Sequence, residues 1–298
     1  MEDNSVVVNE GALVEFTIGI AGIGLSFLVD QDLCEFGVKG TDYDSITDNS
    51  GEVRFRVHYG CIPEMSSGEK IFDSDSTWSL YSTGGKYVLQ DCSFESDSLP
   101  DRVVFLESDF KSGDIYIRDD GANQCLPPDP LGYPLNQILM IILLSLRRGV
   151  MLHACGIDDR GCGYLFLGNS THGKSTMARL WFENHGTVLN DDRIIVRERD
   201  GEIWMYGTPW HGDFEELSPK GLPICKIFFL RHGDKNSAIP KKGAEAVSIL
   251  LTRCFPPLWD KKGMEYTIGL CHHIVEKIPC HELSFEPDMK IVDFVRSI

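Results

Sequence analysis

One run of nine residues is the most informative part of this chain: Gly168-Asn169-Ser170-Thr171-His172-Gly173-Lys174-Ser175-Thr176. It fits the pattern G-x-x-x-x-G-K-[ST], in which glycines let backbone N–H groups converge on phosphate oxygens. An apolar run at 163–167 precedes it and a helical pattern at 175–184 follows it. A helix N-terminus at this place would favour a bound anion. The run therefore predicts a phosphate-binding loop (P-loop) between a strand and a helix.

The P-loop sequence also predicts which residues bind nucleotide and metal. All nine residues from 168 to 176 are candidate nucleotide-binding residues. Lys174 is expected to reach the β- and γ-phosphates, and the Ser175 hydroxyl is expected to bind Mg²⁺. ATP and Mg²⁺ are thus the expected cofactors. The alternative, a glycine turn that binds nothing, would not require a strand before it and a helix after it.

A pair of carboxylates follows the predicted helix. A strand at 187–189 runs into Asp191 and Asp192, and functional groups in α/β sheets collect at strand ends. Neighbouring residues of an extended chain point to opposite sides, so one carboxylate can face a metal while the other faces an acceptor hydroxyl. Asp pairs are also common in turns and at helix caps, and that alternative stays open.

A histidine precedes the loop by one strand. His153 lies in the predicted strand 150–157, which precedes the strand that leads into the P-loop, so it could lie beside the P-loop. A single strand histidine is just as compatible with a satisfied core residue. Lys174, Asp191 and His153 are the candidate catalytic residues, and Ser175 and Asp192 are the candidate metal ligands.

These motifs together resemble the catalytic domain of bacterial HPr kinase/phosphorylase, which is related to ATP-dependent phosphoenolpyruvate carboxykinase. The resemblance covers roughly residues 150–230 and, weakly, the rest of the second half. It implies that Asp191 is the catalytic base toward a serine hydroxyl, with His153 assisting. It also implies that Asp192 and Ser175 lie on the metal side.

Three further segments are similar to HPr-kinase-like proteins that accompany ribosomal-peptide modification, including lasso-peptide tailoring: 152–156, 206–213 and 255–260. That likeness implies a serine of a precursor peptide as the acceptor. The chain departs from the family in its first half and in lacking the later Gly-rich signature. Thr171 and His172 also replace small residues in the loop, which could reduce turnover.

Charge divides the chain into two parts. Residues 1–130 contain 25 Asp and Glu against 8 Lys and Arg, whereas the remainder contains 20 of each sign. We therefore expect an acidic, β-rich domain at 1–130 and an α/β P-loop kinase domain at 131–298. An acidic surface repels phosphate backbones, so nucleic acid is not an expected partner.

Alternating polarity and turn residues predict the individual elements. In the first domain we expect a linker at 126–134 and strands at 53–57, 78–81, 86–89, 102–107 and 114–118, with a hairpin turn at Gly84-Gly85 and a turn at Asp120-Gly121. In the second we expect helices at 135–147, 243–253 and 263–277, the first with a basic last turn at Arg147 and Arg148. Its remaining strands are expected at 194–197, 202–206 and 226–230, with a hairpin turn at Asp200-Gly201.

The ten cysteines are scattered singly, without a C-x-x-C pair, which favours free thiols and a cytoplasmic location. The most apolar run, 138–146, is about half the length of a membrane span, so no membrane association is expected. Zinc is not expected at Cys271-His272-His273 or Cys280-His281, because the spacing of a zinc site is missing.

The sequence favours an ATP-dependent kinase acting on a serine-type hydroxyl of a peptide or protein. Two alternatives stay open: a nucleotide-binding regulator or scaffold with little catalysis, and a kinase of a small molecule such as a free amino acid. Arg253 could clamp a phosphate or cap a helix, and Trp210 and His211 could contact substrate or the core. The acceptor, the use of ATP rather than pyrophosphate, and self-association into a homo-oligomer are left undetermined.

Overall fold

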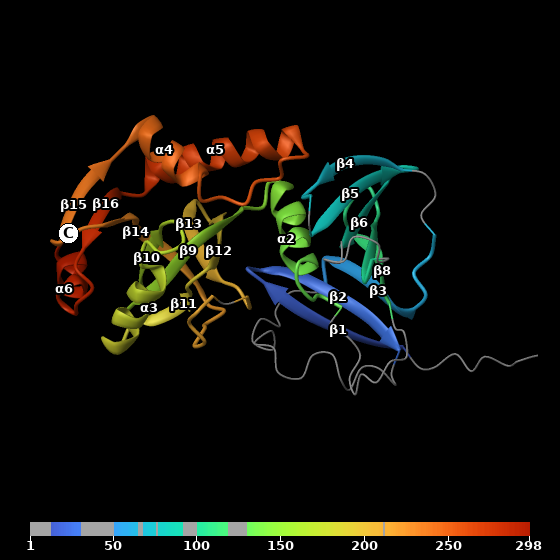
Figure 1. The fold of residues 1–298 in the computed structure, drawn as a ribbon, viewed down its shortest axis with the longest axis horizontal. Helices are drawn as coiled ribbons and strands as arrows, with labels where there is room; N and C mark the ends of the chain where they lie inside the picture. The colour runs from blue at the N-terminus through green and yellow to red at the C-terminus, as the bar shows by residue number, and fades with distance from the viewer. Residues whose placement is uncertain are drawn as a thin grey trace, which may run out of the picture. The chain divides into compact units, whose positions relative to one another are not determined.

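The computed structural model describes residues 13–30, 51–64, 68–75, 77–91, 100–118, 130–210 and 212–298. The chain divides into two compact units, Met1–Asn136 and Gln137–Ile298 (Figure 1). This division falls six residues beyond the boundary expected from composition. Each unit contains one large sheet, so the fold is mixed α/β.

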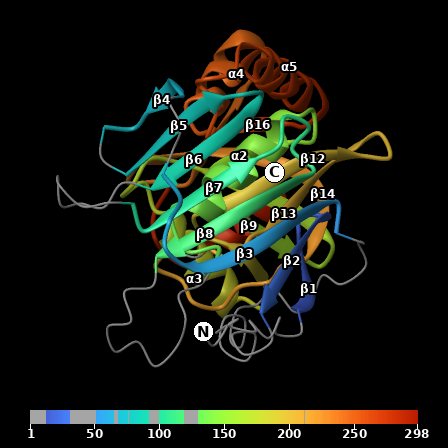
Figure 2. The same ribbon diagram turned by 90° about the vertical axis from the view of Figure 1, so that its right-hand side faces the viewer.

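The described residues of the first unit form an eight-stranded sheet in the order β1-β2-β3-β8-β7-β6-β5-β4, which Figure 2 shows face on. Only the β2–β3 and β3–β8 pairs are parallel. Its strands are β1 (Leu13–Ile20), β2 (Ile23–Asp30), β3 (Val53–Gly60), β4 (Glu69–Asp73), β5 (Trp78–Thr83), β6 (Lys86–Asp91), β7 (Arg102–Leu106) and β8 (Ser112–Arg118).

The predicted hairpin around Gly84-Gly85 is confirmed, because β5 and β6 pair antiparallel across it. The hairpin of β1 and β2 was not predicted, although Ala21 and Gly22 join it with positive φ angles of 52° and 76°. Its signal is an Ala-Gly turn between two alternating runs, and alanine rarely adopts that conformation. The predicted turn at Asp120-Gly121 and residues 126–129 of the predicted linker lie outside the described residues.

The second unit contains the P-loop sequence. Its elements are α2 (Leu135–Ser145), β9 (Val150–Asp159), β10 (Cys162–Leu167), α3 (Lys174–Glu183), β11 (Thr187–Asn190), β12 (Arg193–Arg199), β13 (Glu202–Gly207), β14 (Gly221–His232), β15 (Ser237–Lys241), α4 (Gly243–Leu251), α5 (Lys261–Lys277), β16 (Cys280–Phe285) and α6 (Lys290–Ser297). Every predicted strand and helix of this unit is present, with ends shifted by a few residues.

The sheet of the second unit runs β10-β9-β12-β13-β14-β16-β15, and β10 also pairs with β14. β10, β14 and β16 are mutually parallel neighbours, so the chain leaves β10 at the same edge as it leaves β14. Apolar side chains cover both faces. One core cluster packs the sheet against α4 and α5, and the other packs it against α3 and α6. The result is a sheet between two helical layers (Figure 1).

β9 organises the site. β11 and β12 both pair antiparallel with β9, at Gly156–Asp158 and at Val150–His153 respectively, with Asp191 and Asp192 between them. The two carboxylates therefore sit at an interruption in a strand that is paired on either side.

Two predictions for the second unit needed correction. α2 ends at Ser145, two residues before the predicted end, because Arg147 takes a left-handed φ of 62° and Gly149 N–H bonds back to the Leu144 carbonyl. The predicted basic last turn therefore lies outside the helix. β15 and α6 were not predicted. Among the described residues, no helix combines the length and apolar character needed to cross a membrane.

Candidate phosphate and proton-transfer site

The loop between β10 and α3 has the shape that its sequence predicts. Gly173 has a φ of 91°, and a Cβ placed there would come 2.7 Å from the Phe285 ring, so glycine is required for two separate reasons. Thr171 also has a positive φ, 74°, which is unfavourable for a β-branched residue. Asn169, Ser170 and Thr171 are exposed, so the loop presents its backbone to solvent.

The loop and the start of α3 fit a phosphate group. Lys174 is only 7% exposed, and its Nζ donates to the carbonyls of Gly168 and Asn169, each at 3.1 Å. Within the described residues no side chain caps the first turn of α3, whose N–H groups remain available for an anion. Burial lowers the pKa of Lys174 and nearby Arg253 adds to this, while Asp192 and Asp191 oppose it.

Ser175 and Asp191 form the oxygen-rich side of the site. Ser175 Oγ donates to Asp191 Oδ2 at 2.8 Å and lies 3.5 Å from Asp213 Oδ2. The other oxygen of Asp191 accepts from the Gly212 N–H at 3.0 Å, and the residue is 2% exposed. Hydroxyl and carboxylate oxygens are the ligands that Mg²⁺ takes, together with substrate phosphates and water. These residues therefore fit Mg²⁺.

Asn190 fixes the interruption between β11 and β12, and sequence reasoning did not identify it. Its side chain is fully buried; the amide Nδ2 donates to the carbonyls of Thr208 and Trp210 at 3.0 and 2.7 Å. Its Oδ1 accepts from the N–H groups of Asp192 and Arg193 at 2.7 and 2.8 Å. An Asn before two Asp residues is a signal for such a side-chain-stabilised turn.

Asp192 belongs to a different group from Asp191. Its Oδ1 lies 2.8 Å from His153 Nδ1, and its Oδ2 lies 2.6 Å from an Arg193 guanidinium nitrogen. Burial alone would raise the pKa of Asp192, but the His153 hydrogen bond and the charges of Arg193 and Lys174 outweigh it and lower the pKa. Asp192 is therefore ionised near neutral pH.

The contacts of His153 select its tautomer. Nδ1 lies 2.8 Å from the carboxylate of Asp192 and 3.2 Å from Arg193. A carboxylate accepts and a guanidinium only donates, so Nδ1 can satisfy just one of them. The shorter contact favours Nδ1–H donating to Asp192. In the neutral ring Nε2 then carries no proton and can accept one.

The segment after α4 supports this histidine. His153 N–H donates to the Arg253 carbonyl at 2.8 Å, and Phe255 N–H donates to the Met151 carbonyl at 2.9 Å. The Phe255 ring meets the His153 ring edge to face, with centroids 6.4 Å apart. Burial is the main cause of the lowered pKa of Lys174 and of His172, and the positive charge of Arg253 adds to both shifts, so Arg253 belongs to the cationic surroundings of the loop.

The expected grouping and the observed contacts differ in one respect. Lys174, Ser175, Asp191, Asp192 and His153 do come together, but Ser175 contacts Asp191, whereas the family resemblance implied that Ser175 and Asp192 share the metal side.

The other candidate residues have separate environments. The His172 ring has its Nδ1 at 3.1 Å from the Leu230 carbonyl oxygen and lies 5.3 Å from the ring of His232. Thr176, in the first turn of α3, is half-buried. Trp210 contributes its carbonyl to Asn190, and His211 lies outside the described residues. Across the part of the chain described, no three His, Cys, Asp or Glu residues cluster as a metal site.

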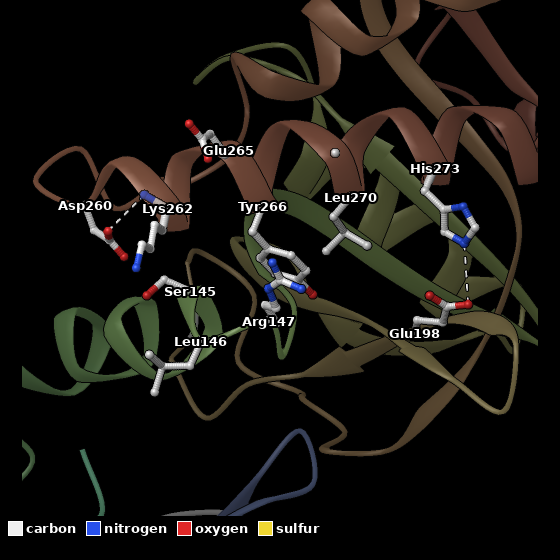
Figure 3. Close-up of a pocket in the computed structure, with 11 residues that line it drawn as sticks. Ser145, Leu146, Arg147, Glu198, Asp260, Lys262, Glu265, Tyr266, Leu270 and His273 are labelled. Carbon is white, nitrogen blue, oxygen red and sulfur yellow. Dashed lines mark hydrogen bonds and ion pairs between the residues drawn. The ribbon is translucent and has the colours of Figure 1, made fainter. Parts of the chain in front are cut away.

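A separate pocket of about 860 Å³ lies between α5, the end of α2 and β12 (Figure 3). None of the P-loop residues lines it. Its charged side chains are of both signs, and several are already engaged: Asp260 caps α5, and His273 lies 3.4 Å from Glu198. The convergence of unlike chemical groups at the loop, rather than the size of this pocket, identifies the candidate site.

No protein-family model matches the chain, and no curated protein does. Among solved structures, it is similar to the Hpr(Ser) kinase/phosphatase from Coxiella burnetii, with a TM-score of 0.31 and 11% sequence identity. The match covers 49% of this chain and 96% of that one. A TM-score this low supports no conclusion about function. The likeness to peptide-tailoring proteins rests on the sequence motifs alone.

Proposed function

We propose that Gln137–Ile298 is an ATP-dependent phosphotransferase that moves the γ-phosphoryl group to a serine-type hydroxyl of a peptide or protein. One observation carries the proposal: a P-loop lysine and serine lie beside two carboxylates, of which one contacts the serine and the other contacts a histidine. A module that only binds nucleotide needs the first contact. The second supplies a proton acceptor, which phosphoryl transfer to a hydroxyl uses.

The donor nucleotide would be held by the P-loop. Lys174 and the N–H groups at the start of α3 would bind the phosphates, and the Arg253 guanidinium would add positive charge. Ser175 and Asp191, with Asp213 nearby, would hold Mg²⁺, which when bound neutralises phosphate charge. Their oxygens need no third carboxylate, because the phosphates complete such a site.

The proton would pass to His153. The acceptor oxygen forms its bond to the γ-phosphorus while the bond from that phosphorus to the β–γ bridging oxygen breaks, and ADP leaves. The acceptor's proton goes to His153 Nε2, and Asp192 stabilises the imidazolium formed. We assign the proton to this pair, rather than to Asp191 as the resemblance implied, because Asp191 contacts Ser175 on the side proposed for Mg²⁺, whereas Asp192 contacts the histidine.

Single-turnover transfer from γ-labelled ATP with Mg²⁺ tests the proposal, using candidate precursor peptides, HPr and free serine as acceptors. We expect label on a peptide or protein, abolished by Lys174→Ala and unchanged by Lys235→Ala, an exposed lysine distant in sequence from the loop. Label on free serine instead would favour the small-molecule kinase. Failure of the wild type to bind nucleotide would refute the proposal.

The second candidate is a nucleotide-binding regulator without catalysis. The strained φ of Thr171 favours it, because a β-branched residue in this conformation stiffens a loop that must adapt to its ligand. It predicts that nucleotide binds to the wild type and is lost with Lys174→Ala, yet no acceptor becomes labelled.

A further inference from the structure

Arg193 lies at the centre of the proton-transfer group without belonging to any motif. It is the first residue of β12 and directly follows Asp192. Its guanidinium contacts Asp192 Oδ2 at 2.6 Å and lies 3.2 Å from His153 Nδ1. Its Nε donates to Gln137 Oε1 at 3.3 Å. One side chain therefore touches both members of the Asp192–His153 pair and a residue of α2.

The flat face of the guanidinium is also occupied. Its central carbon lies 4.3 Å from the centre of the Phe255 ring, a cation–π contact. Phe255 is itself tied to β9 by its backbone hydrogen bond to Met151. The contacts with Asp192 and Gln137 limit the rotation of the guanidinium within its own plane. The stacked Phe255 ring limits the tilt of that plane. A lysine ammonium offers neither the planar fork nor the stacking face.

We propose that Arg193 is a positioning residue for the proton-transfer step: it holds the Asp192 carboxylate in the orientation that accepts the His153 Nδ1–H. This inference rests on the proposed function. Without the guanidinium, Asp192 can rotate about its side-chain bonds, and His153 loses the partner that selects its tautomer. Arg193 would then affect the rate of transfer more than the binding of nucleotide, since it touches none of the P-loop residues in the contacts described here.

A neighbouring arginine provides a matched control. Arg197 lies four residues further along β12, so its side chain leaves the same face of the strand. It is also half-buried and donates to a backbone carbonyl, that of Arg148, at 2.7 Å. It belongs to none of the motifs identified in the sequence. Arg197→Ala therefore reports what the loss of a structural arginine does to this strand.

The experiment compares Arg193→Ala, Arg193→Lys and Arg197→Ala in the full chain. We expect Arg193→Ala to slow single-turnover transfer about 10–100-fold while the Kd for MgADP changes less than twofold. Millimolar guanidinium should restore part of the rate to Arg193→Ala and to neither other protein. Arg193→Lys should remain slow, and Arg197→Ala should lower the Tm without slowing transfer.

A second measurement does not depend on turnover. The ¹⁵N chemical shifts of the His153 ring show which nitrogen carries the proton, and we expect Nδ1–H in the wild type and a tautomer mixture in Arg193→Ala. If Arg193→Ala keeps the wild-type ¹⁵N pattern, or if it transfers the phosphoryl group at the wild-type rate, the inference is overturned. If the ¹⁵N pattern changes as expected from the wild type to Arg193→Ala but the wild type labels no acceptor, the proposed function fails and the positioning contact stands.

Discussion

The two units use carboxylates differently. The first holds the excess acidic charge, and two of its ion pairs are open to solvent: the side chains of His58 with Asp114 and of Lys86 with Glu107 are 34–49% exposed. A third pair in this unit, Arg102 with Asp91, is 17% and 11% exposed. The second is balanced in charge, yet it buries Asp191 and holds Asp192 among His153, Arg193 and Lys174. Exposed pairs contribute little to stability. The location of charge, rather than its amount, distinguishes the candidate site.

The largest expected difference between the units is in catalysis. Asp192→Asn should lower turnover about 10²–10⁴-fold, because a neutral amide cannot stabilise the imidazolium that forms when His153 accepts the proton. Asp191→Asn should instead weaken the Mg²⁺ dependence of nucleotide binding. Titrations of nucleotide with and without Mg²⁺, beside single-turnover rates, separate the two.

Asp114→Asn is the control from the first unit, since Asp114 is exposed and pairs with His58 on the surface of its sheet. It should leave both measurements unchanged. Equal losses in Asp191→Asn and Asp192→Asn, by the same measurement, would contradict the division of roles between the two residues.

The next effect concerns stability. Arg296 on α6 makes two hydrogen bonds of 2.8 Å to Asp159 at the end of β9, and these lower the pKa of that carboxylate. The Asp159 side chain is 7% exposed and that of Arg296 is 24% exposed. Removing one partner of such a pair with Asp159→Asn should cost about 3 kcal/mol in the free energy of unfolding at pH 7. Denaturant titration measures the loss, with Asp293→Asn, 84% exposed, as the control.

The sign of the pH dependence follows from the direction of the shift. Because the pKa of Asp159 is lower in the folded protein, its contribution is present above the unfolded pKa of about 3.9 and disappears as pH falls through the folded value. The advantage of the wild type over Asp159→Asn should therefore shrink below about pH 4. A difference that stays constant down to pH 2 would rule out this ion pair as its origin.

The smallest effect is expected at Asp91 in the first unit, where burial raises the pKa despite the hydrogen bonds from the backbone N–H groups of Arg102 and Asp101 and the Arg102 guanidinium 3.8 Å away. Here the folded state prefers the neutral carboxyl, so ionisation opposes folding. Asp91→Asn keeps an oxygen acceptor and should gain up to about 1 kcal/mol at pH 7. The gain should vanish below the unfolded pKa, and a clear loss at pH 7 would show that the charge of Asp91 is needed.

Local sequence signals predicted most of the second unit. The P-loop, its flanking strand and its flanking helix are determined by residues that are adjacent in the sequence. The same holds for hairpin turns such as Asp200-Gly201. The strand β1 was missed because its turn contains alanine in a glycine-like conformation.

The contacts that complete the site could not be predicted from one sequence. Arg193 stacks on Phe255, 62 positions later, and the Arg253 carbonyl accepts from His153, 100 positions earlier. Such pairs depend on how β9, β12 and the segment after α4 are brought together, and no local pattern encodes that. Asn190 could have been found, since its side chain acts on residues two and three positions ahead.

The pairing of both β11 and β12 with β9 has a consequence for how this chain tolerates changes in length. An added residue between Asn190 and Arg193 would shift one of the two strands by one position against β9, and every later side chain of that strand would change face. An added residue at Asp200-Gly201, a turn at the far end of β12, would lengthen only a loop. Relatives of this chain should therefore vary in length at the second position and keep a fixed spacing at the first.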